Sequence, residues 1–203
     1  AFALTGNASD VDVDDILTYT WEQTDDGVVT QSSFGPTNVS GANFRSQKPT
    51  TDPTRYFPKL ASVLAGNLTE TNPDVNSSWE TVSDVEREMN FALTVRDNAE
   101  GGGQVVSDLM QVSVVSSAGP FEMISQAANQ TYTAGTAQNI VWDVANTDMA
   151  PVNVQTVDIL LSIDGGATFT IPLAEDVPND GDHKVVLPGT PTTPARIMVK
   201  AKD

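Results

Sequence analysis

The feature that most constrains the fold is an alternating segment at residues 88–96. Its apolar side chains occupy every second position: Met89, Phe91, Leu93 and Val95. A period of two is typical of a β-strand with one buried and one solvated face. Three glycines at 101–103 follow, and glycine supplies the backbone freedom that a tight turn needs. A second apolar strand at 105–115 then predicts an antiparallel hairpin.

The rest of the chain holds more short strand-like segments, separated by turns rich in proline and glycine. They are predicted at residues 2–6, 17–22, 138–144, 157–163, 168–173, 183–187 and 195–201. Many short strands with such turns indicate an all-β fold. Trp21 takes the place of the core tryptophan of an immunoglobulin-like sandwich. The predicted fold class is all-β, with two tandem antiparallel β-sandwiches, the first immunoglobulin-like and the second fibronectin-III-like.

The run Ser116-Ser117-Ala118-Gly119-Pro120 predicts a flexible boundary between two domains. The first domain is expected to cover residues 1–117 and the second to cover residues 118–203. Residues 25–85 are irregular and rich in proline, so we expect a long insertion there, with one short helix at 60–66. The first domain begins at what this assignment makes strand B, and the second ends after strand F. Each sandwich is therefore expected to have an open sheet edge within this sequence.

The charge of the chain limits its partners. Acidic residues number 27 and basic residues 10, which gives a net charge of −17. This field repels nucleic acid and anionic membrane surfaces, so we expect no nucleic-acid partner. No apolar run approaches the length of a membrane span, so we expect no membrane insertion. The chain has no cysteine, so a secreted form of it must be held together by core packing, to which a bound metal can add.

An acidic loop precedes the strand at 17–22. Its carboxylates are four in six residues: Asp10, Asp12, Asp14 and Asp15. Alternate carboxylates gather hard cations, above all calcium, whereas the simpler interpretation is a solvated acidic turn. In an immunoglobulin-like sandwich the B–C and F–G loops lie at the same end, which would bring Asp97 to this loop. We predict a structural calcium site formed by Asp10, Asp12, Asp14 and Asp97.

Catalytic residues are hard to find in this sequence. The single histidine, His183, lies in a turn that enters a strand, and the zinc-peptidase motif His-Glu-x-x-His is absent from the sequence. The segment 162–169 resembles the Asp-box of sialidases and many other β-proteins. That box is an element of folding, in which Asp164 accepts backbone hydrogen bonds across a hairpin turn. We therefore predict no catalytic site in this chain.

One tryptophan outside the predicted strands is a candidate for ligand binding. Trp79 lies among polar residues of the insertion, where an exposed indole can stack on a sugar or a peptide. The alternative is that Trp79 anchors the insertion to its own domain.

Several motifs together resemble known modules. Leu4-Thr5-Gly6, Asp10-Val11-Asp12 and the run from Leu17 to Gln23 are similar to PKD- or cadherin-like modules. Further runs extend the likeness: Phe44-Arg45-Ser46, Arg55-Tyr56-Phe57-Pro58, 91–98, Gly119-Pro120-Phe121, 141–145, 162–169, Pro178-Asn179-Asp180-Gly181 and 195–199. Almost the whole chain resembles the region that follows the catalytic domain in secreted bacterial reprolysin-like zinc metallopeptidases. One departure is that Val13 replaces the usual glycine and the acidic loop is one residue longer.

The resemblance implies a non-catalytic accessory region of a secreted bacterial protein, with the catalytic domain of a zinc metallopeptidase upstream. Its expected role is that of a calcium-stabilised spacer or a substrate-binding module, and its expected location is extracellular. The alternative is a segment of a cell-surface adhesin that binds polysaccharide or protein. In both cases the expected partner is an extracellular protein or a polysaccharide.

Overall fold

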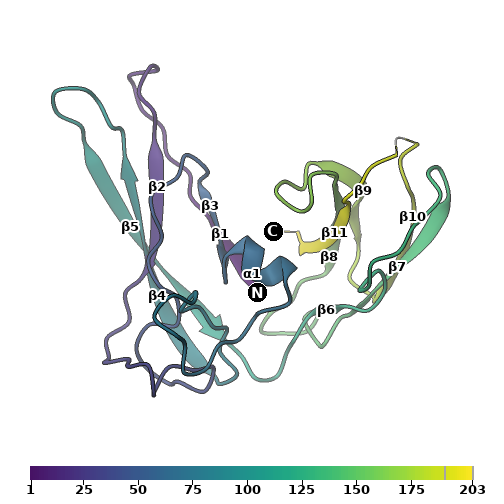
Figure 1. The fold of residues 1–203 in the computed structure, drawn as a ribbon, viewed down its shortest axis with the longest axis horizontal. Coiled ribbons are helices and arrows are strands. Elements are labelled where there is room, and N and C mark those ends of the chain that lie inside the picture. Colours follow the sequence, from purple (N-terminus) through teal and green to yellow (C-terminus); the bar gives the residue numbers. More distant parts are fainter. Residues whose placement is uncertain (190, 203) are drawn as a thin grey trace. The chain divides into compact units, whose positions relative to one another are not determined.

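A computed structural model describes residues 1–189 and 191–202 (Figure 1). The chain divides into two compact units, Ala1–Ser116 and Ser117–Asp203, one residue before the boundary predicted from the sequence. Both units consist of antiparallel strands, and the described residues contain one short helix. The all-β class predicted from the sequence is confirmed.

The first unit contains one three-stranded and one two-stranded antiparallel sheet. The larger sheet has the order β2-β4-β5, formed by Thr18–Gln23, Arg87–Arg96 and Val105–Val114. The smaller sheet pairs β1, Phe2–Thr5, with β3, Thr54–Phe57. Strands C, F and G of an immunoglobulin-like sandwich have the first order, and strands B and E pair in the other sheet. The pairing of the first unit therefore follows the predicted strand assignment.

Side chains from both sheets form the core of the first unit. The buried members are Leu4, Trp21, Phe44, Phe57, Met89, Phe91, Leu93 and Val95. Phe57 and Phe91 pack edge to face, with ring centroids 4.9 Å apart. The Trp21 indole donates a hydrogen bond to the Pro53 carbonyl at 3.1 Å, so its polar edge is satisfied inside the core. The alternating positions of β4 supply half of this core, as the sequence pattern predicts.

The insertion at 25–85 contains a strand in addition to the predicted short helix. It contributes β3 and the helix α1, Leu60–Leu64. Glu80 is 2% exposed, and its carboxylate accepts hydrogen bonds from the Arg55 guanidinium at 2.9 Å and from the Lys59 backbone N–H at 2.8 Å. The same guanidinium donates to the Trp21 and Arg45 carbonyls. A buried ion pair thus connects β3 with a later part of the insertion, and the same arginine ties both to β2.

A second buried arginine orders the beginning of the insertion. The Arg87 guanidinium donates to the carbonyls of Asn38 at 3.1 Å and Gly41 at 2.8 Å, and to the Asn43 side-chain oxygen at 3.1 Å. It also lies 3.5 Å from the Asp25 carboxylate. These contacts satisfy loop carbonyls that burial would otherwise leave without partners.

The second unit consists of two three-stranded antiparallel sheets, with the orders β10-β7-β6 and β11-β8-β9. The strands are β6, Glu122–Met123, β7, Ala137–Asp143, β8, Thr156–Ser162, β9, Ile171–Pro178, β10, Asp182–Val186, and β11, Arg196–Ala201. The buried core contains Ile140, Trp142, Val157, Ile159, Val177 and Val185. The Trp142 indole donates to the Asn179 side-chain oxygen at 2.9 Å. Strands from both sheets contribute to this core, so the second unit buries apolar surface of its own.

Candidate metal site

The acidic loop connects β1 to β2 and turns sharply over its last residues. The Asp12 N–H donates to the Asp10 carboxylate at 2.9 Å, and the Asp15 N–H donates to the Asp12 carbonyl at 3.1 Å. The first contact is the local side-chain turn that aspartate forms with the backbone two residues on. The second folds the loop back, so that positions 12 and 15 lie close together.

Three carboxylates of this loop meet. Oxygens of Asp10, Asp12 and Asp15 all lie within 4.8 Å of one another. Asp10 and Asp12 are exposed, and Asp15 is half-buried. The predicted ligand Asp14 is exposed and does not belong to this group; Asp15 takes its place. The physical reason is the turn at 12–15, because alternation along an extended chain would have selected position 14.

Asp97 is buried near the same loop, but it forms backbone hydrogen bonds there and is not part of the carboxylate cluster. Its carboxylate accepts the Gln104 N–H at 2.8 Å and the Ala99 N–H at 3.2 Å, so it closes the turn between β4 and β5. Its negative charge still repels the carboxylates of the cluster electrostatically. The pKa of Asp15 is raised above its ordinary value, first by desolvation and then by the carboxylates of Asp97, Asp12 and Asp10.

Asn98, which was not among the predicted site residues, connects the acidic loop to the turn between β4 and β5. Its side-chain amide donates to the Ile16 carbonyl at 2.7 Å and to the Thr18 hydroxyl at 3.0 Å. Its φ of 58° is the left-handed conformation that asparagine tolerates better than most residues. An asparagine two residues after the end of a long strand and shortly before a glycine turn is the signal that could have identified it.

The donor set fits a hard cation. Calcium binds six to eight oxygens at about 2.3–2.6 Å, so two of its ligands are separated by at most about 5 Å. The separation of 4.8 Å or less among Asp10, Asp12 and Asp15 satisfies this limit. All three are oxygen ligands, which suits calcium or magnesium better than zinc. Asp97 would act through its charge and by holding the neighbouring turn.

Trp79 is an anchor of the insertion. Its ring is half-buried, lies 5.4 Å from the Phe34 ring centroid, and has the Arg45 guanidinium 5.6 Å from its own centroid. The indole N–H donates to the Asp74 carbonyl at 2.9 Å. The predicted ligand-stacking surface is therefore occupied in part by the chain itself.

The Asp-box segment forms the turn between β8 and β9. The Asp164 carboxylate accepts the Thr168 N–H at 3.0 Å and the Thr168 hydroxyl at 2.7 Å. The Ser162 hydroxyl donates to the same carboxylate at 2.6 Å. Gly165 and Gly166 have φ values of 80° and 98°, which side chains rarely adopt. These hydrogen bonds hold the pKa of Asp164 far below its usual range, which is the behaviour of a structural acceptor.

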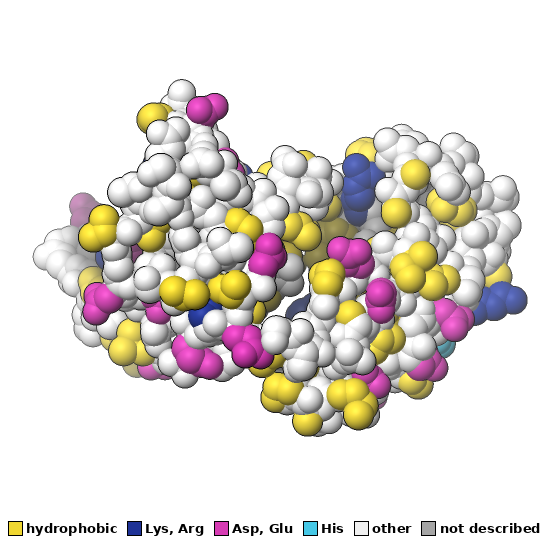
Figure 2. All heavy atoms as spheres, turned by 90° about the horizontal axis from the view of Figure 1, so that it is seen from below, with side chains coloured by type: hydrophobic (Ala, Val, Ile, Leu, Met, Phe, Trp, Pro, Cys, Tyr) yellow, Lys and Arg dark blue, Asp and Glu magenta, His cyan; other side chains and the backbone are white. Residues whose placement is uncertain are grey.

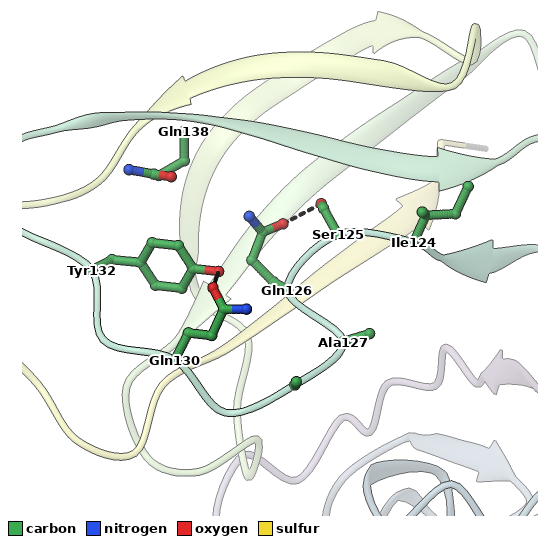
Figure 3. Close-up of a pocket in the computed structure, with 8 residues that line it drawn as sticks. Ile124, Ser125, Gln126, Ala127, Gln130, Tyr132 and Gln138 are labelled. Atoms are coloured by element: carbon green, nitrogen blue, oxygen red, sulfur yellow. Dashed lines mark hydrogen bonds between the residues drawn. The ribbon is translucent and has the colours of Figure 1, made fainter.

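The second unit has a shallow depression of about 450 Å³ (Figure 3). It is lined by Ile124, Ser125, Gln126, Ala127, Ala128, Gln130, Tyr132 and Gln138. The Tyr132 hydroxyl donates to the Gln130 side-chain oxygen at 3.0 Å, and Ser125 donates to Gln126. This lining offers no carboxylate, imidazole or amine for acid–base chemistry. His183 lies on β10, with Ile140 opposite it on β7.

Comparisons with family models, with curated proteins and with solved structures found no match to this chain. Within residues 1–189 and 191–202, no helix is long and apolar enough to cross a membrane. In Figure 2 acidic side chains are scattered over the surface and basic side chains are sparser, which agrees with the net charge of −17.

Proposed function

We propose that this chain is a non-catalytic accessory region of a secreted bacterial zinc metallopeptidase, in which a calcium-stabilised β-sandwich serves as a spacer or substrate-binding module. The observation that carries the proposal is the convergence of Asp10, Asp12 and Asp15. A cation there would neutralise mutual repulsion and brace the loop that enters β2. The resemblance of the motifs to the modules of these enzymes supports the assignment to that class of parent protein.

The chemistry of the titratable groups supports a non-catalytic role. Asp164 is committed to its hairpin turn, and Glu80 is committed to a buried ion pair. The acidic cluster lies at the surface, where Asp10 and Asp12 are exposed and Asp15 is half-buried. Purified protein is expected to hydrolyse neither protein nor glycoside substrates. Turnover that disappears in His183→Ala would overturn this part of the proposal.

The calcium site is tested by following backbone amide signals of the full chain by NMR during a calcium titration. We expect saturable shifts that concentrate in the acidic loop and around Asn98, with a Kd of about 10⁻⁴–10⁻³ M, typical of extracellular modules. Asp15→Asn is expected to remove the response. Asp14→Asn is the matched control and is expected to retain it, because Asp14 lies outside the cluster. An unchanged spectrum, or equal responses of both variants, would contradict the site.

A further inference from the structure

Strand β5 leaves one side of its backbone unpaired. The sheet order β2-β4-β5 makes β2 and β5 the two edges. The edge of β2 is partly closed, because Tyr19 and Thr50 exchange backbone hydrogen bonds of 2.8 and 3.1 Å. Within the described part of the chain, β5 pairs with β4 alone. Figure 1 shows β5 on the outer side of this sheet.

The antiparallel register shows which groups point outward. The Asp97 N–H donates to the Gln104 carbonyl at 3.4 Å, so Gln104 directs its backbone toward β4. Since antiparallel pairs alternate, every second β5 residue from Val106 onward does the same. The outward backbone groups belong to Val105, Ser107, Leu109, Gln111 and Ser113. The Leu109 N–H indeed donates to the Asp108 carboxylate at 2.8 Å, a contact on the open side.

Apolar side chains of β5 are exposed on both faces of the sheet. Leu109 is 75% exposed on the outer face, and Val106 is 60% exposed on the core face. The core face of β5 is incompletely covered because the opposing sheet has only two strands of four residues, whereas β5 has ten. An open edge with exposed apolar side chains on both faces is a template for another strand.

Three edge strands of the second unit carry features that discourage such pairing. β6 has two residues, β9 contains two prolines and an irregular register, and β11 carries Arg196 and Lys200. Short strands, proline, bulges and basic side chains are the usual ways in which an edge is protected. β5 has an unbroken register with β4, no proline, and Asp108 as its single charged residue.

We propose that β5 is a docking edge, to which an extended segment of another protein with neutral to basic side chains adds as a further strand. This inference goes beyond the proposed calcium site and does not depend on it. Backbone donors and acceptors at a strand edge select an extended peptide as the occupant. Leu109, Met110 and Gln111 of β5 also line a depression of about 510 Å³, which extends over Asn90 and Phe91 of β4. The Asp108 carboxylate on this strand and the net charge of −17 favour an incoming strand that carries lysine or arginine.

Charge also argues against a second copy of the chain as the occupant. Two molecules of net charge −17 repel each other, and antiparallel pairing of two β5 strands brings two Asp108 carboxylates into one small sheet. In the docked state a carbonyl of the incoming strand replaces the Asp108 carboxylate at the Leu109 N–H. The released carboxylate is then free to pair with a basic side chain of the same strand.

The test uses a synthetic peptide as long as β5, with alternating threonine and valine, two lysines and blocked ends. Its binding to the full chain is measured by fluorescence anisotropy. We expect saturable binding that weakens at least about tenfold when alternate peptide amides are N-methylated, because the backbone hydrogen bonds are lost. Replacing the lysines by glutamates is expected to weaken binding as well, and more so at low salt.

Two protein variants locate the binding at β5. Leu109→Pro removes an outward N–H that β4 does not use, and is expected to abolish binding; Leu109→Ala keeps this N–H and is expected to retain most of it. If Leu109→Pro does not fold, the N-methylated peptide decides the question with the unmodified protein. The proposal would be overturned if the unmodified and the N-methylated peptides bound equally well, or if the unmodified peptide did not bind. Dimerisation that Leu109→Pro removes, measured by sedimentation equilibrium, would instead assign the edge to a second copy and would also overturn it.

Discussion

At the scale of single residues, the most informative group is the Asp15 carboxyl. Its pKa is raised because burial and three neighbouring carboxylates disfavour its charged form. A raised carboxyl pKa means that the folded state holds the proton more tightly than the unfolded state. The ionised cluster therefore lowers the stability of the metal-free protein as the pH rises through and above the ordinary pKa of aspartate. A bound cation would reverse this effect.

Asp15→Asn is predicted to change the Tm of the first unit in opposite directions in chelator and in calcium. In chelator, Asp15→Asn is expected to raise the Tm of the first unit, because it removes a charge that its neighbours repel. In calcium, the same variant is expected to melt below the unmodified protein, because it loses a ligand. Thermal unfolding, monitored by circular dichroism, gives the Tm in each buffer. The control Asp14→Asn should follow the unmodified protein in both buffers, and a change of the same sign in both buffers for Asp15→Asn would refute the account.

The hydrogen bonds to Asp164 predict that the stability of the second unit depends on pH in the opposite direction. Its pKa is depressed by hydrogen bonds from Ser162 and Thr168, so the folded state favours the charged carboxylate. The stabilisation is fully present above the ordinary aspartate pKa of about 4 and is lost as the pH falls toward the depressed folded value. Asp164→Ala is therefore expected to lower the Tm of the second unit at neutral pH, and to lower it progressively less below pH ~4. A difference in Tm that stays constant down to the lowest measurable pH would contradict this assignment.

At the scale of elements, the order of the insertion depends on its buried charges. Removing one partner of a buried ion pair leaves the other without compensation, which costs about 3–5 kcal/mol. Glu80→Ala removes the partner of Arg55 together with the acceptor of the Lys59 N–H. We expect a loss of this order in the free energy of unfolding of the first unit, measured by urea denaturation. The exposed Glu100→Ala is the matched control and should change it by less than about 0.5 kcal/mol.

Some strands could be predicted from the sequence and others could not. The β4–β5 hairpin was predictable because its alternation extends over many residues and ends at glycines. β3 escaped prediction because it has four residues between Pro53 and Pro58, too few to reveal a period. Its pairing with β1 depends on contacts between distant parts of the chain, which local patterns do not encode.

The candidate site was predictable in its location and less so in its members. Clustered aspartates before a strand indicated the loop, and the strand assignment indicated that Asp97 lies nearby. The selection of Asp14 assumed an extended loop, whereas the hydrogen bond from the Asp15 N–H to the Asp12 carbonyl turns the chain and brings Asp15 inward. The contacts of Asn98 follow from a left-handed backbone conformation that residue order alone does not reveal.

At the scale of the whole molecule, each unit has its own buried core, so each is expected to unfold as a separate cooperative transition. Phe91→Ala should destabilise the first unit by about 3–5 kcal/mol, and Ile159→Ala the second by about 2–5 kcal/mol. Both side chains are fully buried. Differential scanning calorimetry should show that each variant shifts one transition and leaves the other in place. A single transition that moves as a whole in both variants would contradict independent units.

The most direct test of the account is calorimetry of the full chain in calcium and in chelator at equal ionic strength. A ligand that binds only the folded state stabilises by mass action, by about 2.7 kcal/mol when its concentration is about 100 times Kd. We predict that calcium raises only the transition that Phe91→Ala lowers, that the shift grows with calcium concentration, and that Asp15→Asn eliminates it. Identical transitions in calcium and in chelator, or equal shifts of both units, would contradict a calcium site formed by Asp10, Asp12 and Asp15.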